Sequence, residues 1–142
     1  MKEFQEFVAN GDVRKGLRDI ALARSLKEFS EKRIKYAQLM PLTEQSAFLT
    51  YETVYDALRE LIDSLLALEG YKSYSHVASI AYLQKFPDIS PAEIAKLDNA
   101  REKRNLAKYY AKPITLAEAK DIRALHSTLK PKLLLIFQRL LC

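Results

Sequence analysis

The segment REKRNLAKYYAKP, residues 101–113, gathers the side chains of this sequence that are best suited to bind an anion. Guanidinium and ammonium groups form charge-assisted hydrogen bonds with phosphate and carboxylate oxygens. At about 100° per residue along a helix, four polar side chains continue the apolar stripe that Ile94 begins: Arg101, Arg104, Asn105 and Lys108. A face that turns cationic halfway along is unusual for a helix that only packs. The pattern predicts a cleft or a subunit interface, where these cations pair with carboxylates or bind a phosphate.

A second interpretation stays open because the same segment carries a stripe of small residues, Ala100, Ala107 and Ala111. If these alanines form the packing face of the helix, the cations point into solvent and carry no site.

Other chemistry-bearing residues give weaker patterns. Four carboxylates, Glu52, Asp56, Glu60 and Asp63, recur at helical spacing, and we interpret them as a solvated face. The two histidines, His76 and His126, lie far apart and lack the partners of a zinc site, so we expect no metal. Three glycines cannot build a phosphate-binding loop, and we expect no cofactor.

The composition is that of a single globular domain spanning residues 1–142, with 49% hydrophobic and 29% charged residues. A net charge of +5 permits contact with phosphates but does not require it. The lone cysteine, Cys142, excludes an intrachain disulfide and favours a reducing compartment. The charged N-terminus predicts no secretory signal, and no apolar run is long enough to span a membrane. We therefore expect a soluble, cytoplasmic protein.

Helical periodicity dominates the elements that must position these residues. We expect helices over 13–40 and 43–69, a shorter one within 73–86, and two more that begin at the SPAE and TLAE capping boxes, at Ser90 and Thr115. Gly70 should end the second helix in a left-handed conformation, and Pro131 should kink or split the last one. Apolar stripes include Leu17, Leu26, Phe29, Ile34, Phe48, Tyr51, Leu58 and Leu65. No run predicts a strand, so the expected fold is all-α, an antiparallel bundle of about five helices.

The run YETVYDALRELIDSLLALEGYKSYSHVASIAYLQK, residues 51–85, resembles the middle of the HEPN superfamily of small helical domains. The features in common are an aromatic-rich helix, a glycine at Gly70, and a Ser–His pair, Ser75 and His76, that opens the next helix. Arg104 and Asn105 are similar to the arginine and following polar residue of HEPN nucleases. The resemblance covers residues 21–140. It implies a HEPN-like bundle that forms a homodimer, binds RNA and cuts it without a metal ion, often beside a nucleotidyltransferase partner.

The resemblance also implies roles for single residues. Arg104 would hold a phosphate, Asn105 would orient it, and Tyr109 would stand where the family has a histidine; Arg101, Lys108 and Tyr110 would line the substrate path. A phenol is a poor base at neutral pH, and losing an acid–base group typically costs roughly 10²–10⁴-fold in rate. His76 or His126 could substitute for the missing histidine.

Two functions follow as expectations. One is a HEPN-like protein that binds RNA or a nucleotide phosphate, a weak or inactive metal-independent ribonuclease of toxin–antitoxin or defence type. The alternative is a non-catalytic helical interaction module that partners another protein, such as a nucleotidyltransferase.

Overall fold

The computed structural model describes all 142 residues of the chain. Its elements follow one another as α1 (Phe4–Asn10), β1 (Val13–Lys15), α2 (Ile20–Leu39), α3 (Ala47–Leu68), β2 (Tyr71–Ser73), α4 (His76–Tyr82), the 3₁₀ turn η1 (Leu83–Lys85), α5 (Pro91–Tyr110) and α6 (Leu116–Leu141). The protein is therefore predominantly α-helical, as the sequence predicts.

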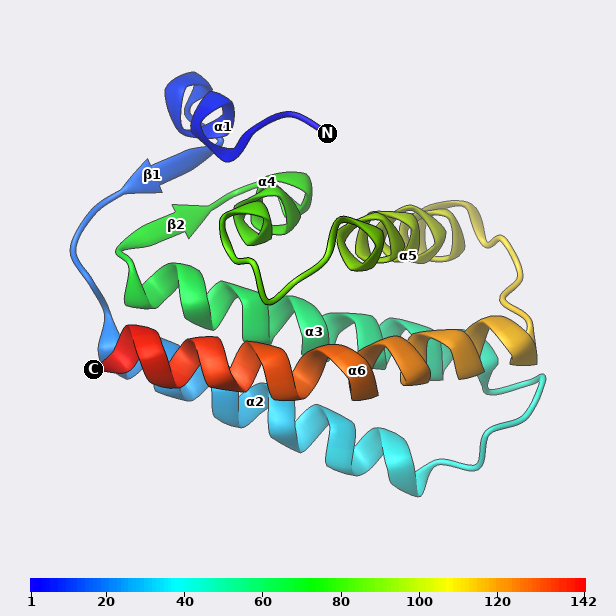
Figure 1. The fold of residues 1–142 in the computed structure, drawn as a ribbon. Helices are drawn as coiled ribbons and strands as arrows, with labels where there is room; N and C mark the ends of the chain where they lie inside the picture. The colour runs from blue at the N-terminus through cyan, green and yellow to red at the C-terminus, as the bar shows by residue number, and fades with distance from the viewer.

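Helix α3 lies at the centre of the arrangement (Figure 1). Helices α2 and α6 pack along one side of it, and α4, α5 and β2 contact it from the other. The middle of α3 supplies several large buried apolar residues of the core, among them Leu58, Leu61, Ile62 and Leu65. They join residues of α6 such as Leu129 and Ile136 in one apolar cluster. Because of this central position, neighbouring elements cover nearly every face of α3.

Local signals set the ends of the helices as predicted. The Ser90 and Thr115 side chains each accept a hydrogen bond from the backbone amide three residues on, and the Glu93 and Glu118 carboxylates accept one from the backbone amide of the cap residue. Both capping boxes are therefore confirmed. Gly70 follows α3 with φ = 81°, so the left-handed end predicted for that helix is also confirmed.

A two-stranded antiparallel sheet corrects the prediction that the chain contains no strand. β1 pairs with β2, and Val13 stands opposite Ser73, which comes 60 positions later in the sequence. Residues 13–19 were expected to be helical, but α2 begins only at Ile20, after Asp19 caps it. A strand of three residues is too short to show the alternation of apolar and polar residues by which a strand is recognised in a sequence. The chain also has six α-helices rather than about five, because α1 precedes β1.

Pro131 was expected to kink or split the last helix, and the split is wrong, since α6 runs through Pro131 from Leu116 to Leu141. Pro131 lies on the exposed face, where water can satisfy the carbonyl that loses its helical partner.

Helix α2 buries a different face from the one that its large apolar residues predicted. Small residues, Ala23, Ser30 and Ala37, are buried with Ile34, and the Ser30 hydroxyl donates to the Ala57 carbonyl of α3 at 2.6 Å. Small side chains allow α2 to approach α3 closely. Large apolar side chains expected inside are exposed here and in the neighbouring segments, namely Phe29 of α2, Leu17 (93%) before α2 and Phe48 of α3, and Leu26 is only partly buried. We call the exposed Leu22, Phe29, Tyr36 and Leu39 the α2 outer stripe.

No helix combines the length and the apolar character that crossing a bilayer requires.

The two left-handed glycines give a matched test of this packing. A Cβ at Gly70 would lie 2.4 Å from the Gly16 carbonyl oxygen, whereas a Cβ at Gly11, with φ = 89°, meets nothing within 4 Å. We expect Gly70→Ala to lower the free energy of unfolding by at least about 3 kcal/mol, from backbone strain plus the clash. Gly11→Ala should cost about 1 kcal/mol, from strain alone. Urea unfolding measures both, and equal losses would contradict the close approach at Gly70.

Candidate functional site

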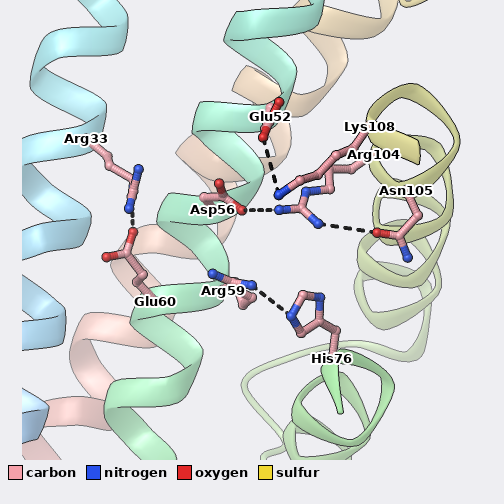
Figure 2. Close-up of polar contacts among 9 residues, drawn as sticks. All are labelled: Arg33, Glu52, Asp56, Arg59, Glu60, His76, Arg104, Asn105 and Lys108. Carbon is pink, nitrogen blue, oxygen red and sulfur yellow. Dashed lines mark hydrogen bonds and ion pairs between the residues drawn. The ribbon is translucent and has the colours of Figure 1, made fainter. Parts of the chain in front are cut away.

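Arg104 lies at the buried end of the site, and its side chain extends from α5 toward α3. Its side chain is only 4% exposed. Its Nη2 donates to Asp56 Oδ1 at 3.2 Å and its Nη1 donates to Asn105 Oδ1 at 3.4 Å, as Figure 2 shows. The guanidinium also lies 5.8 Å from the centre of the Tyr55 ring. The prediction that the cationic face of this helix is covered is confirmed for Arg104, and the alternative that its cations all face solvent is wrong there.

Arg59 and His76 form the second half of the site (Figure 2). The Ser75 side chain caps α4 by accepting from Ala78, which fixes His76 as the first residue of that helix. Arg59 Nη1 donates to His76 Nε2 at 2.7 Å. Burial lowers the pKa of His76, and the positive charges of Arg59 and Arg104 lower it further, so the imidazole is neutral at neutral pH. A neutral ring can accept from Arg59, which only donates.

We call Asp56, Arg59, His76, Arg104 and Asn105 the arginine–histidine cluster. Its donors outnumber its acceptors. No carboxylate oxygen lies within 4.0 Å of the Arg59 guanidinium. The Nε atoms of Arg59 and Arg104 are both buried and have no hydrogen-bond partner. Chemically, this arrangement can receive an anionic oxygen and offers a neutral imidazole next to it.

Other predicted site residues lie further out. Arg101 is paired with Asp98 at 2.9 Å and Glu102 at 3.6 Å, and exposed Lys108 lies 3.8 Å from Glu52. They form a cationic rim on α5 rather than part of the cluster.

The two tyrosines of the segment do not reach the cluster. Tyr109 is 65% exposed and Tyr110 is 73% exposed. The last turn of α5 therefore presents both rings to solvent, and the position expected for a histidine faces away from Arg59.

The carboxylates of α3 are not a solvated face, which corrects the sequence interpretation. Glu60 is buried and paired with Arg33 of α2, and Asp56 holds Arg104. Asp63 accepts from the Ser79 hydroxyl at 3.3 Å, and burial raises its pKa to about 6 despite the nearby Arg59 charge. The reason is that α2 covers Glu60 on one side of α3 while α5 and α4 cover Asp56 and Asp63 on the other, and the pattern of a single helix does not reveal such a covering.

Sequence reasoning missed Arg59 as a functional residue. A signal was present, because Arg59 stands three residues after Asp56 and four before Asp63, on the same side of the helix. His76 was considered only as a substitute for the absent histidine, and the structure brings it to Arg59. His126, the other candidate, is buried on α6, where burial and then Lys130 lower its pKa to about 4. It has no hydrogen bond to the cluster.

No three histidine, cysteine, aspartate or glutamate side chains gather in a way that could hold a metal ion. No protein-family model matches the chain, and neither a curated protein nor a solved structure matches it. The HEPN resemblance therefore stays a prediction.

Replacing Asp63 tests how strongly this region is desolvated. Because its pKa in the folded protein, about 6, lies above the ordinary 3.8, its contribution to stability is complete below about pH 4 and is lost as the pH rises through 6. Asp63→Asn removes that loss. Between pH 4 and pH 7, the free energy of unfolding of wild type should therefore fall relative to that of the variant by up to about 3 kcal/mol. Asp121→Asn, at an exposed position on α6, is the control. A pH-independent difference for Asp63→Asn would contradict its burial.

Proposed function

We propose that this protein binds the phosphate of RNA or of a nucleotide at the arginine–histidine cluster, in the cytoplasm. The observation that carries the proposal is the pair of buried, unpartnered Nε atoms of Arg59 and Arg104. A buried donor without a partner costs about 1–3 kcal/mol, and more when it is charged. An anionic ligand that accepts from these atoms would recover that energy.

The charge balance supports an anion rather than a neutral ligand. Asp56 is the only carboxylate that pairs with Arg104, and Arg59 donates to an uncharged imidazole. Further positive potential comes from Arg101 and Lys108 at the rim, although carboxylates partly offset both. Among biological anions, phosphate matches the spread donors of two guanidinium groups best.

The HEPN resemblance favours RNA as the source of the phosphate. On this proposal Arg104 and Arg59 hold the phosphate, and Asn105 orients Arg104. His76 takes the acid–base role that the sequence left with Tyr109: once Arg59 donates to the phosphate instead of to His76, Nε2 of the neutral imidazole is free to accept a proton from a 2′-hydroxyl. No metal ion takes part in such a step.

Binding of a labelled single-stranded RNA, measured by anisotropy with a chelator present, tests the site. Arg59→Gln removes one charged hydrogen-bond donor and should weaken binding about tenfold or more. Arg24→Gln, which removes the same charge from an exposed position on α2, should bind like wild type. Equal binding by the two variants would refute the site.

Cleavage of the same RNA separates a nuclease from a binding protein. If wild type cleaves, His76→Gln should slow cleavage roughly 10²-fold or more while Tyr109→Phe leaves it unchanged. Binding without cleavage would make the chain a non-catalytic RNA-binding protein.

A second candidate function, the interaction module, is favoured by the α2 outer stripe. Leu22, Phe29 and Tyr36 are exposed at intervals of seven residues, and Leu26 lies between them. This spacing is typical of a helix that pairs with another helix. We propose a second copy of this chain as the partner, which gives the expected homodimer.

Light scattering across protein concentrations tests this pairing. Phe29→Ser with Tyr36→Ser should raise the dimer dissociation constant at least about 100-fold, because each copy loses two buried aromatic contacts. Leu135→Ser, on an exposed face of α6, should leave the dimer intact. A wild-type protein that is monomeric at every concentration would exclude the second copy.

A further inference from the structure

The outer face of the β1–β2 ribbon carries an unfavourable pair of charges. Arg14 and Lys72 stand directly opposite each other in the antiparallel register. Both are exposed, whereas Val13 of β1 points into a small core with Phe7. Like charges in directly opposed positions destabilise a sheet. Nothing in the packing of the ribbon requires cations at these two positions.

No acidic side chain compensates the pair. Neither Arg14 nor Lys72 forms an ion pair within 4.0 Å, although Asp12 precedes β1. The neighbouring Lys15 differs, since it donates to the Glu69 carbonyl at 2.6 Å and lies 4.2 Å from the centre of the Tyr71 ring. Lys15 is therefore held within the fold, and Arg14 and Lys72 are left for an external anion.

An aromatic ring lies close to both of these cations. Tyr74 follows β2 and is 57% exposed. The Arg14 guanidinium lies 6.0 Å from the centre of its ring and the Lys72 ammonium 5.6 Å from it. An exposed ring flanked by cations is the arrangement on which nucleobases stack while their phosphates meet the charges.

The ring stands at the edge of a groove between the ribbon and helices α2 and α3, with a volume of about 600 Å³. Leu17, Leu22 and Leu26 supply apolar lining, and Asp19 and Asp63 also line the groove. Three cations, Arg14, Lys15 and Lys72, line it as well, so its charges are mixed. The carboxylates disfavour a phosphate in the part that they line, and the groove therefore suits a nucleotide whose base packs on the leucines and whose phosphates meet Arg14 and Lys72.

We propose that Arg14, Lys72 and Tyr74 form a second binding site, for single-stranded RNA, next to the cluster. This inference rests on the proposed function and specifies its substrate as a strand of several nucleotides rather than a mononucleotide. The two sites are continuous along the chain, because Tyr74 is followed by the cap Ser75 and then by His76. Asp63, which lines the groove, is also one helical turn from Arg59.

Strand length is the variable that separates the two sites. Anisotropy is measured with a labelled dinucleotide and with a labelled single strand of about 12 nucleotides. Tyr74→Ala should weaken binding of the long strand about tenfold and leave the dinucleotide unchanged, because stacking of one base is lost. Tyr74→Phe keeps the ring and should restore binding. Arg14→Gln with Lys72→Gln should lower the dependence of log affinity on log salt by about 1.4.

Controls and contrary outcomes are distinct for each site. Leu135→Ala, at an exposed position on α6 outside both sites and the α2 outer stripe, should bind the long strand like wild type. Loss of binding in Arg59→Gln with unchanged binding in the ribbon variants would overturn the ribbon site and keep the cluster. Loss in the ribbon variants alone would keep the ribbon and refute the cluster. Equal affinity for duplex RNA, or for vesicles of anionic lipid, would overturn the assignment to single strands.

Discussion

The arrangement of the whole protein depends on one constraint, the row of charges that α3 carries through the middle of the fold. Asp56, Glu60 and Asp63 are largely enclosed, and a buried charge is costly unless a partner meets it. Three of the neighbouring helices supply one: Arg33 from α2, Arg104 from α5 and Ser79 from α4. Buried ion pairs of this kind often add little net stability compared with apolar packing. Their effect here is to specify which helix lies against which side of α3.

The same constraint accounts for the unpaired donors of the arginine–histidine cluster. Pairing along α3 is incomplete at Arg59, whose guanidinium donates to a neutral imidazole, whereas Arg104 pairs with a carboxylate. In desolvated surroundings an unpaired donor is costly, and any hydrogen bond that it forms is stronger than in water. Near neutral pH the cluster thus combines fixed positive charge with an uncharged imidazole.

Features that depend on neighbouring residues could be predicted from the sequence, and features that depend on distant ones could not. The caps at Ser90 and Thr115, the left-handed Gly70 and the burial of Arg104 follow from local spacing. The β1–β2 pairing and the buried face of α2 do not, because small residues decided that face while the large ones remained outside. The same distinction explains why Arg104 was identified and Arg59 was not. Arg104 belongs to a pattern within one helix, whereas Arg59 is marked by its contact with His76 of α4. A helical pattern shows which residues share a side, but it does not show which other helix will cover that side.

The separate core beneath the ribbon has a consequence for the order of folding. Phe7, Val13, Ala78 and Ala81 form a cluster of four buried residues apart from the 31-residue main core. Because α2 and α3 separate β1 from β2 in the sequence, pairing the two strands closes a long loop, and we expect the segment from α1 to β1 to dock late. A unit with so little buried surface is also expected to open while the helices around α3 remain intact. The N-terminal segment lines the groove through β1, so its opening would remove one side of the groove. Its amides would also exchange with solvent more readily than those of α3.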